Sequence, residues 1–342
     1  MTILAEIPSK SWVKCASLVI LTCQSSCLIL LMRASRTQKD TELYLISTVV
    51  VCSEFLKLLL SACLVIFQEG NLLRGLSLMY TQIFIQYKDT VQILIPSTLY
   101  VIQNNLLYFA ISRLNAVLYQ ILYQSKIFTT AVFMIILLNQ RLRSLQWFSL
   151  LLLSAGIVLT QLPSTNDSSK SNGISSPSLY GFGAILLASV TSGFAGVYLE
   201  KMFKGTPTSI WMRNLQLALC GVPISLLGVY MNDAAKVKSL GFFHGYTPIV
   251  WIVIILQAFG GLAIAFVMKY ADNILKSFSM GLSVILSTLI SYFVFDDLTP
   301  NIYLFLGSTL VISATVLYGL PANYCSLTDA CTTSSDVNKA TI

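Results

Sequence analysis

Long hydrophobic stretches alternate with short polar ones along almost the whole chain. The hydrophobic stretches are about 20 residues long, the length that an α-helix needs to cross a bilayer. A segment in lipid must satisfy its own backbone hydrogen bonds, so we expect each stretch to be a helix. The pattern predicts ten spans, at roughly residues 13–32, 44–67, 92–112, 115–139, 146–162, 180–200, 208–230, 248–269, 273–295 and 301–319.

One polar segment divides these spans into two groups of five. Residues 163–179 are rich in Ser, Asn, Pro and Gly, which is typical of a flexible linker. Because five is odd, the two groups should have opposite orientations, as in carriers built from inverted repeats. The expected domains are a cytosolic segment 1–12, a first repeat 13–162, the luminal linker 163–179, a second repeat 180–320 and a disordered cytosolic tail 321–342.

Composition supports a membrane protein. The chain has 342 residues, of which 56% are hydrophobic and only 10% are charged. A soluble domain carries about 25% charged residues. The net charge of +7 comes from basic residues scattered through short loops, so no nucleic-acid surface is predicted. The spacing of cysteines and the single histidine indicates no metal site, and no motif indicates a cofactor.

An even number of spans places both termini on the same side of the membrane. The predicted loops on the N-terminal side carry more Lys and Arg than the opposite loops, which favours cytosolic termini. In that orientation the glycosylation sequon at Asn166 faces the lumen.

Lys126 is the only charged residue between Arg113 and Arg141. A lysine at the centre of a span costs roughly 2.5–3.5 kcal/mol, so it requires a partner, a wet cavity or a function. Its neighbours on the helix are polar but uncharged: Tyr119, Gln120, Tyr123 and Thr130. Helical spacing places residues 119, 123, 126 and 130 on one face. This face suits an anionic ligand with a flat ring. Pairing with a distant acid such as Glu54 is the alternative.

Amide side chains are a second polar theme within the spans. The third span carries Tyr100, Gln103, Asn104 and Asn105, and the seventh carries Asn214 and Gln216. Amides in hydrocarbon are costly unless they form hydrogen bonds. They either join helices together or match the donors and acceptors of a nucleobase edge.

Other charged residues in spans have simpler interpretations. Glu54 and Lys57 are three residues apart, so they can pair as a structural bridge or as part of a gate. Lys276 has Asp272 four residues earlier as a candidate partner, and Arg213 beside Trp211 reads as an interfacial anchor. Four glycines at expected helix contacts act in static packing or as hinges: Gly193, Gly196, Gly260 and Gly261.

Several longer motifs resemble one family, the nucleotide-sugar transporters of the Golgi and endoplasmic reticulum. These motifs are "QNNLLYFAISRLNAVLYQILYQSKI", "SGFAGVYLEK", "RNLQL", "GFFHGYTP", "QAFGGL" and "KYADNILKSFS". The resemblance covers roughly residues 12 to 320 and lies within the subfamily for UDP-galactose, UDP-N-acetylglucosamine and CMP-sialic acid. It implies the ten-helix drug/metabolite transporter fold. It also implies exchange of a cytosolic nucleotide sugar for a luminal nucleoside monophosphate, with no enzymatic activity.

The resemblance also assigns roles to residues. Lys126 and Lys276 match the family lysines that bind phosphates, with Ser277 beside the second. Positions matching the nucleoside pocket are Tyr100, Gln103, Asn104, Tyr119 and Asn214. The expected partners are a UDP-sugar, UMP and the lipid bilayer of the Golgi or endoplasmic reticulum. Homodimer formation and association with Golgi glycosyltransferases are left open.

The segment after Asn214 separates members of the subfamily. Carriers of CMP-sialic acid resemble "NIQMYLSG" there, whereas this chain has "NLQLALCG", with Ala218 and Cys220 in place of a tyrosine and a serine. The prediction is therefore exchange of UDP-galactose or UDP-N-acetylglucosamine, or both, for UMP. A CMP-sialic acid/CMP antiporter and a carrier of another metabolite are the alternatives.

Overall fold

The computed structural model describes residues 10–37, 42–111, 113–114, 116–161, 179–295 and 302–320. All regular structure in these residues is helical. The first group of helices comprises α1 (Lys10–Thr37), α2 (Ile46–Glu69), α3 (Leu72–Tyr80), a short π-helix η1 (Thr81–Ile85), α4 (Tyr87–Ile111), α5 (Ala116–Tyr123), α6 (Ser125–Leu138) and α7 (Ser144–Thr160). The second comprises α8 (Leu179–Gly205), α9 (Ile210–Leu240), α10 (Pro248–Tyr270), α11 (Asn273–Phe295) and α12 (Ile302–Gly319).

The prediction of an all-α membrane protein is confirmed. Among the described residues, eight stretches are long and apolar enough to cross a membrane: α1, α2, α5 and α6 together, and α8 to α12. The shorter α7 is also apolar. The helix α4 has 25 residues and carries Gln103, Asn104 and Asn105. Helical structure thus occupies each of the ten predicted segments, while Asn166, the linker and the tail lie outside the described residues.

The predicted single helix at 115–139 is wrong in one respect, because the chain breaks into α5 and α6 at Gln124. The backbone there forms hydrogen bonds between residues three apart, from Gln124 N to Ile121 O (3.2 Å) and from Ile127 N to Gln124 O (3.0 Å). Irregular backbone at membrane depth is tolerated where it lines a cavity. The break lies two residues before Lys126, so it positions that lysine in the first turn of α6.

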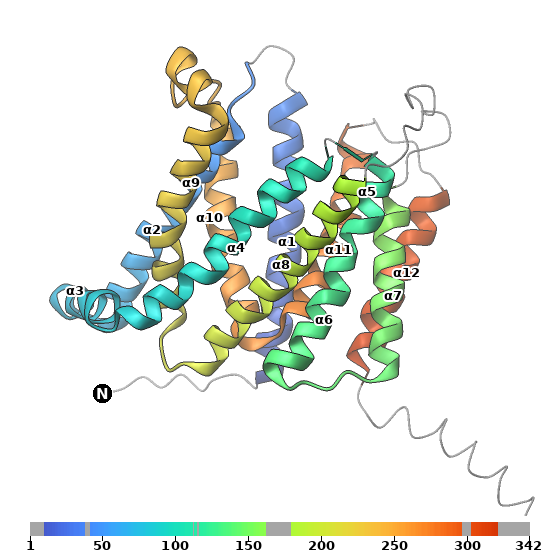
Figure 1. Ribbon diagram of the computed structural model, residues 1–342, viewed down its shortest axis with the longest axis horizontal. Coiled ribbons are helices and arrows are strands. Elements are labelled where there is room, and N and C mark those ends of the chain that lie inside the picture. The colour runs from blue at the N-terminus through green and yellow to red at the C-terminus, as the bar shows by residue number, and fades with distance from the viewer. Residues whose placement is uncertain are drawn as a thin grey trace, which may run out of the picture.

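The sequence pattern missed the helical segment formed by α3 and η1. Figure 1 shows α3 nearly end-on, whereas most of the other helices run along the bundle. The exposed side chains of α3 and η1 include Leu73, Tyr80, Phe84 and Ile85. A short helix with an apolar exposed face is typical of the membrane interface. We call the side of the molecule that holds α3 and the start of α1 the α3 side (Figure 1), and the opposite side the far side.

Helices from the two halves pack against one another throughout the bundle. The helices α4 and α8 cross its middle side by side, α2 packs on α9, and α1 packs on both α10 and α11 (Figure 1). At one edge α7 packs on α12, where an added Cβ at Gly156 would lie 2.9 Å from the carbonyl oxygen of Gly307. Large apolar side chains such as Phe67, Phe293 and Phe305 stay exposed on the outside, as expected of a surface that contacts lipid.

Candidate functional site

Two cavities adjoin in the middle of the bundle. The first has a volume of about 510 Å³ and is lined by α4, α5, α6, α7, α8 and α11. The second has a volume of about 530 Å³ and is lined by α2, α4, α8, α9, α10 and α11. Tyr100 and Lys276 line both cavities, so these two residues mark their junction. The arrangement is a two-lobed chamber with a cation at its waist.

The first lobe, which we call the tyrosine lobe, contains the face predicted around Lys126. The rings of Tyr119 and Tyr123 stack with centroids 6.0 Å apart at an angle of 17°. The Lys126 ammonium lies 4.0 Å from the centroid of the Tyr123 ring, a cation–π contact. Within the described residues, Lys126 forms no ion pair with a carboxylate, so pairing with Glu54 is not observed.

Buried acceptors without partners lie in the same lobe. Gln103 and Gln124 line the tyrosine lobe. Their Oε1 atoms are buried and form no hydrogen bond within the described part of the chain. A buried polar atom without a partner costs about 1–3 kcal/mol. A ligand carrying hydroxyl or amide donors would recover part of this cost.

The second lobe, which we call the amide lobe, is lined by Asn104, Asn105, Asn214 and Asn232. The side chain of Asn105 donates to Val101 O at 2.9 Å. That of Asn214 donates to Ile210 O at 3.1 Å. These bonds to the preceding turn fix the amides on the wall of the lobe rather than between helices. Neither of these two bonds joins one helix to another.

Glu54 and Lys57 form the predicted pair on the wall of the amide lobe. The Lys57 Nζ lies 2.6 Å from one carboxylate oxygen of Glu54 and 2.7 Å from the other. Both residues line the lobe. A Cβ added at Gly261 would lie 2.7 Å from Lys57 Cδ, so this glycine leaves room for the lysine stem. The predicted pairing is therefore observed on the chamber wall.

The other predicted glycines also lie at close approaches. An added Cβ at Gly193 would lie 2.8 Å from the backbone nitrogen of Thr130, and one at Gly260 would lie 2.5 Å from the amide nitrogen of Gln24. Gly196 lines the tyrosine lobe and is close to Asn273. All four predicted glycines therefore lie where another helix approaches closely.

The structure brings together nearly all of the predicted binding residues. The tyrosine lobe is lined by Tyr100, Gln103, Tyr119, Gln120, Tyr123, Lys126, Lys276 and Ser277. The amide lobe is lined by Tyr100, Asn104, Asn105, Asn214 and Lys276. Sequence reasoning missed polar lining residues that carry no pattern of their own: Ser97, Gln124, Gln161, Ser192, Ser225, Asn232 and Asn273.

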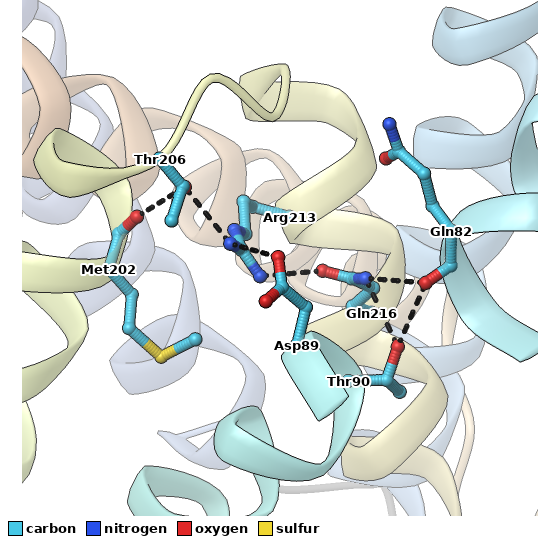
Figure 2. Close-up of polar contacts among 7 residues, drawn as sticks. All are labelled: Gln82, Asp89, Thr90, Met202, Thr206, Arg213 and Gln216. Carbon is cyan, nitrogen blue, oxygen red and sulfur yellow. Dashed lines mark hydrogen bonds and ion pairs between the residues drawn. The ribbon is translucent and has the colours of Figure 1, made fainter. Parts of the chain in front are cut away.

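Gln216 is the exception, because it lines neither lobe. Its amide nitrogen donates to Thr90 Oγ1 at 3.1 Å and to Gln82 O at 3.4 Å. Arg213 accompanies it and is only 1% exposed, so the prediction of an interfacial anchor is corrected. Both side chains belong to a cluster at the α3 side of the chamber (Figure 2).

A buried carboxylate that the sequence analysis overlooked lies beside Lys276. Glu200 of α8 is 0% exposed, contacts Lys204 Nζ at 2.6 Å and accepts from Asn273 N at 2.9 Å. Asp272 accepts from Leu275 N at 2.7 Å, so it caps α11. No ion pair between Asp272 and either Lys269 or Lys276 occurs in the described residues. The sequence does contain a signal for Glu200, because Lys204 lies four residues later, at the spacing of an ion pair on a helix.

A helical membrane protein with a polar, cationic chamber at its centre has the architecture of a carrier. The family model of nucleotide-sugar transporters matches residues 9–319 of this chain. The chain therefore belongs to the nucleotide-sugar transporter family, and it is a transporter rather than an enzyme.

Known proteins agree with this family. The UDP-N-acetylglucosamine transporter of Rattus norvegicus is 47% identical over 309 residues, which cover 90% of this chain and 95% of the relative. The UDP-N-acetylglucosamine/UDP-N-acetylgalactosamine transporter nstp-4 of Caenorhabditis elegans is 43% identical over 320 residues, covering 91% and 94%. The UDP-galactose translocator of Mus musculus is 43% identical over 309 residues, covering 90% and 78%.

The fold is also similar to that of a solved crystal structure. The TM-score is 0.63 at 14% sequence identity, and the match covers 91% of this chain and 97% of the other. At this identity the likeness concerns the fold alone.

Proposed function

We propose that this protein exchanges a cytosolic UDP-sugar for luminal UMP by alternating access. UDP-N-acetylglucosamine and UDP-galactose are the proposed sugars, because relatives at 43–47% identity are transporters of these compounds. The proposed architecture is ten spans in two inverted repeats, with both termini in the cytosol and the Golgi membrane as the location.

One observation carries the proposal: the shape and charge of the two-lobed chamber. A UDP-sugar has a base and ribose at one end, a sugar at the other and a diphosphate between them. The chamber has two lobes with Lys276 at their junction and Lys126 in the tyrosine lobe. One lysine comes from α6 in the first half and the other from α11 in the second. A diphosphate bound by both lysines would therefore connect the two halves.

The charges also support exchange rather than one-way transport. A UDP-sugar and UMP each carry about two negative charges near neutral pH. Either ligand neutralises Lys126 and Lys276, whereas the empty chamber retains two cations that repel each other. We infer that the empty carrier reorients slowly and that a bound anion removes this barrier.

Local sequence favours uridine over cytidine. Ala218 is fully buried and Cys220 is 6% exposed, and neither residue lines a lobe. They lie between the lobe-lining residues Leu217 and Gly221 and add no polar group to the lobe. The tyrosine and serine of CMP-sialic acid carriers have no counterpart here.

A panel of labelled nucleotide sugars tests this proposal. Purified protein in liposomes is loaded with either UMP or CMP and offered UDP-N-acetylglucosamine, UDP-galactose or CMP-sialic acid. We expect UMP to drive uptake of at least one UDP-sugar and CMP to drive little. Preferential uptake of CMP-sialic acid against CMP would contradict the assignment, and no uptake of any of the three would point to another metabolite.

A further inference from the structure

A polar cluster around the buried side chain of Arg213 lies beside the chamber on the α3 side, and Figure 2 shows its contacts. The Arg213 Nη2 lies 3.1 Å from Asp89 Oδ2 and donates to Thr206 Oγ1 at 2.9 Å. Its Nη1 donates to Gln216 Oε1 at 3.1 Å. We call the six residues of this cluster the Arg213 network: Gln82, Asp89, Thr90, Thr206, Arg213 and Gln216.

The network begins where the chamber ends. On α9 the first lobe-lining residue is Asn214, directly after Arg213, and the lining continues along the helix as far as Asn232. On α4 the lining begins at Ser97, two turns beyond Asp89. In the interval on α4, Ile93 packs with Met202 and Cys220. On α9 the network adjoins the lobe directly, because Arg213 is next to Asn214.

Three polar bonds of this network join α9 to the first half, at Asp89, Thr90 and Gln82. Gln82, Asp89 and Thr90 come from η1 and α4 in the first half, whereas Thr206, Arg213 and Gln216 come from the second half. Arg213 is 1% exposed, but the side chain of Asp89 is 40% exposed. A buried guanidinium is stable only while its carboxylate stays in place. Separating the halves at this point would expose the guanidinium to water, which would replace the lost partner.

The opposite end of the chamber also has polar contacts between the halves: Ser47 Oγ donates to Asp233 Oδ2 at 2.6 Å, and Tyr246 OH donates to Thr48 Oγ1 at 3.1 Å. The lining of the amide lobe reaches Ser47, in the first turn of α2, and Asn232 on α9, both toward the far side. The network at the α3 side is distinguished by its buried guanidinium, because Arg213 is paired across the halves while only 1% exposed.

We propose that the Arg213 network is the contact that closes the carrier on the α3 side and breaks each time the chamber opens there. This inference rests on the proposed function, in which the α3 side is cytosolic. Alternating access requires a contact between halves that forms in one state and is absent in the other. An ion pair that is buried when closed and hydrated when open suits that role. Arg213 is thus a positioning residue, which acts on access and not on the ligand.

A reversible cross-link tests the closure. Thr90 Oγ1 and Gln216 Nε2 are 3.1 Å apart, so the double variant Thr90→Cys/Gln216→Cys can be bridged by a short bis-methanethiosulfonate, which forms a disulfide with each cysteine. We expect the bridged protein to lose exchange of UDP-sugar for UMP, to recover it after reduction, and to keep stabilisation by UMP in thermal unfolding throughout. The two single-cysteine variants treated in the same way control for the native cysteines. Undiminished exchange by the bridged protein would overturn the proposal.

A second measurement does not depend on transport. The variant Asp89→Asn removes the charge but keeps an acceptor for Arg213. With Ser97→Cys as a reporter on the chamber wall, we expect this variant to react faster with a membrane-impermeant thiol reagent added from the α3 side. Ser97→Cys with the native network is the reference. Equal labelling rates in the two proteins would refute the closure, even if the transported ligand proved different from the one proposed.

Discussion

At the scale of residues, Lys126 is the central feature, because it pairs with no carboxylate among the residues that the structure describes. Helical spacing from the sequence placed Tyr119, Tyr123 and Thr130 on its face, and the structure places all three around the same lobe. The sequence could not provide the other side of that lobe, where Lys276 arrives from the second half. Nor could it reveal that Gln216 donates hydrogen bonds to Thr90 and Gln82, because those bonds join residues more than 120 positions apart.

Substitutions at Lys126 test the phosphate role directly. We expect Lys126→Ala to lose nearly all exchange, because a buried charge-assisted contact with the phosphate disappears. Lys126→Arg keeps the charge but changes the donor geometry, so we expect partial activity. Lys201→Ala, at an exposed position on α8, is the matched control and should behave as the unchanged protein. Initial rates in liposomes provide the measurement, and normal rates for both Lys126 variants would contradict the role.

At the scale of elements, helix positions were predictable, because span length and hydrophobicity decide them. The break at Gln124 and the helix pair α3–η1 were not, since neither interrupts the hydrophobic pattern in a recognisable way. The break depends on a cavity that exists only after α11 and α8 have packed nearby. The sequence indicated that helices approach closely at the predicted glycines. Only the packed structure identifies the residues that lie against each glycine.

Two glycines of α8 provide a matched test of helix packing. We expect Gly193→Ala to destabilise the protein by about 1–3 kcal/mol, because the new methyl would meet the backbone of Thr130 on α6. Gly183→Ala on the same helix has open space around it and should be neutral or stabilising, by up to about 1 kcal/mol. Thermal unfolding in detergent compares the two. Similar midpoints for both variants would show that the α6–α8 contact tolerates separation.

The start of α11 provides a second element-scale prediction. We expect Asp272→Ala to cost about 1 kcal/mol, because Leu275 N loses its capping acceptor. Burial raises the pKa of the Asp272 carboxyl, so a neutral acceptor should serve there nearly as well. Asp272→Asn is therefore expected to unfold close to the unchanged protein. Equal losses in the alanine and asparagine variants would attribute the effect to charge instead of to capping.

At the scale of the whole molecule, the two halves meet around one chamber and each contributes one lysine. Loss of either cation should therefore affect exchange in the same way. Variants Lys126→Ala and Lys276→Ala combined should lose little more than either alone, since the two act as one unit. Multiplicative losses in the double variant would show that the lysines act on separate steps.

The most direct test of the central claim is the dependence of uptake on the internal ligand. Liposomes containing the protein are prepared empty or loaded with UMP, and uptake of labelled UDP-N-acetylglucosamine and UDP-galactose is followed in each. Since the empty chamber holds two repelling cations, the account predicts rapid uptake with internal UMP and slow uptake without it. Equal rates in loaded and empty liposomes would contradict the exchange mechanism.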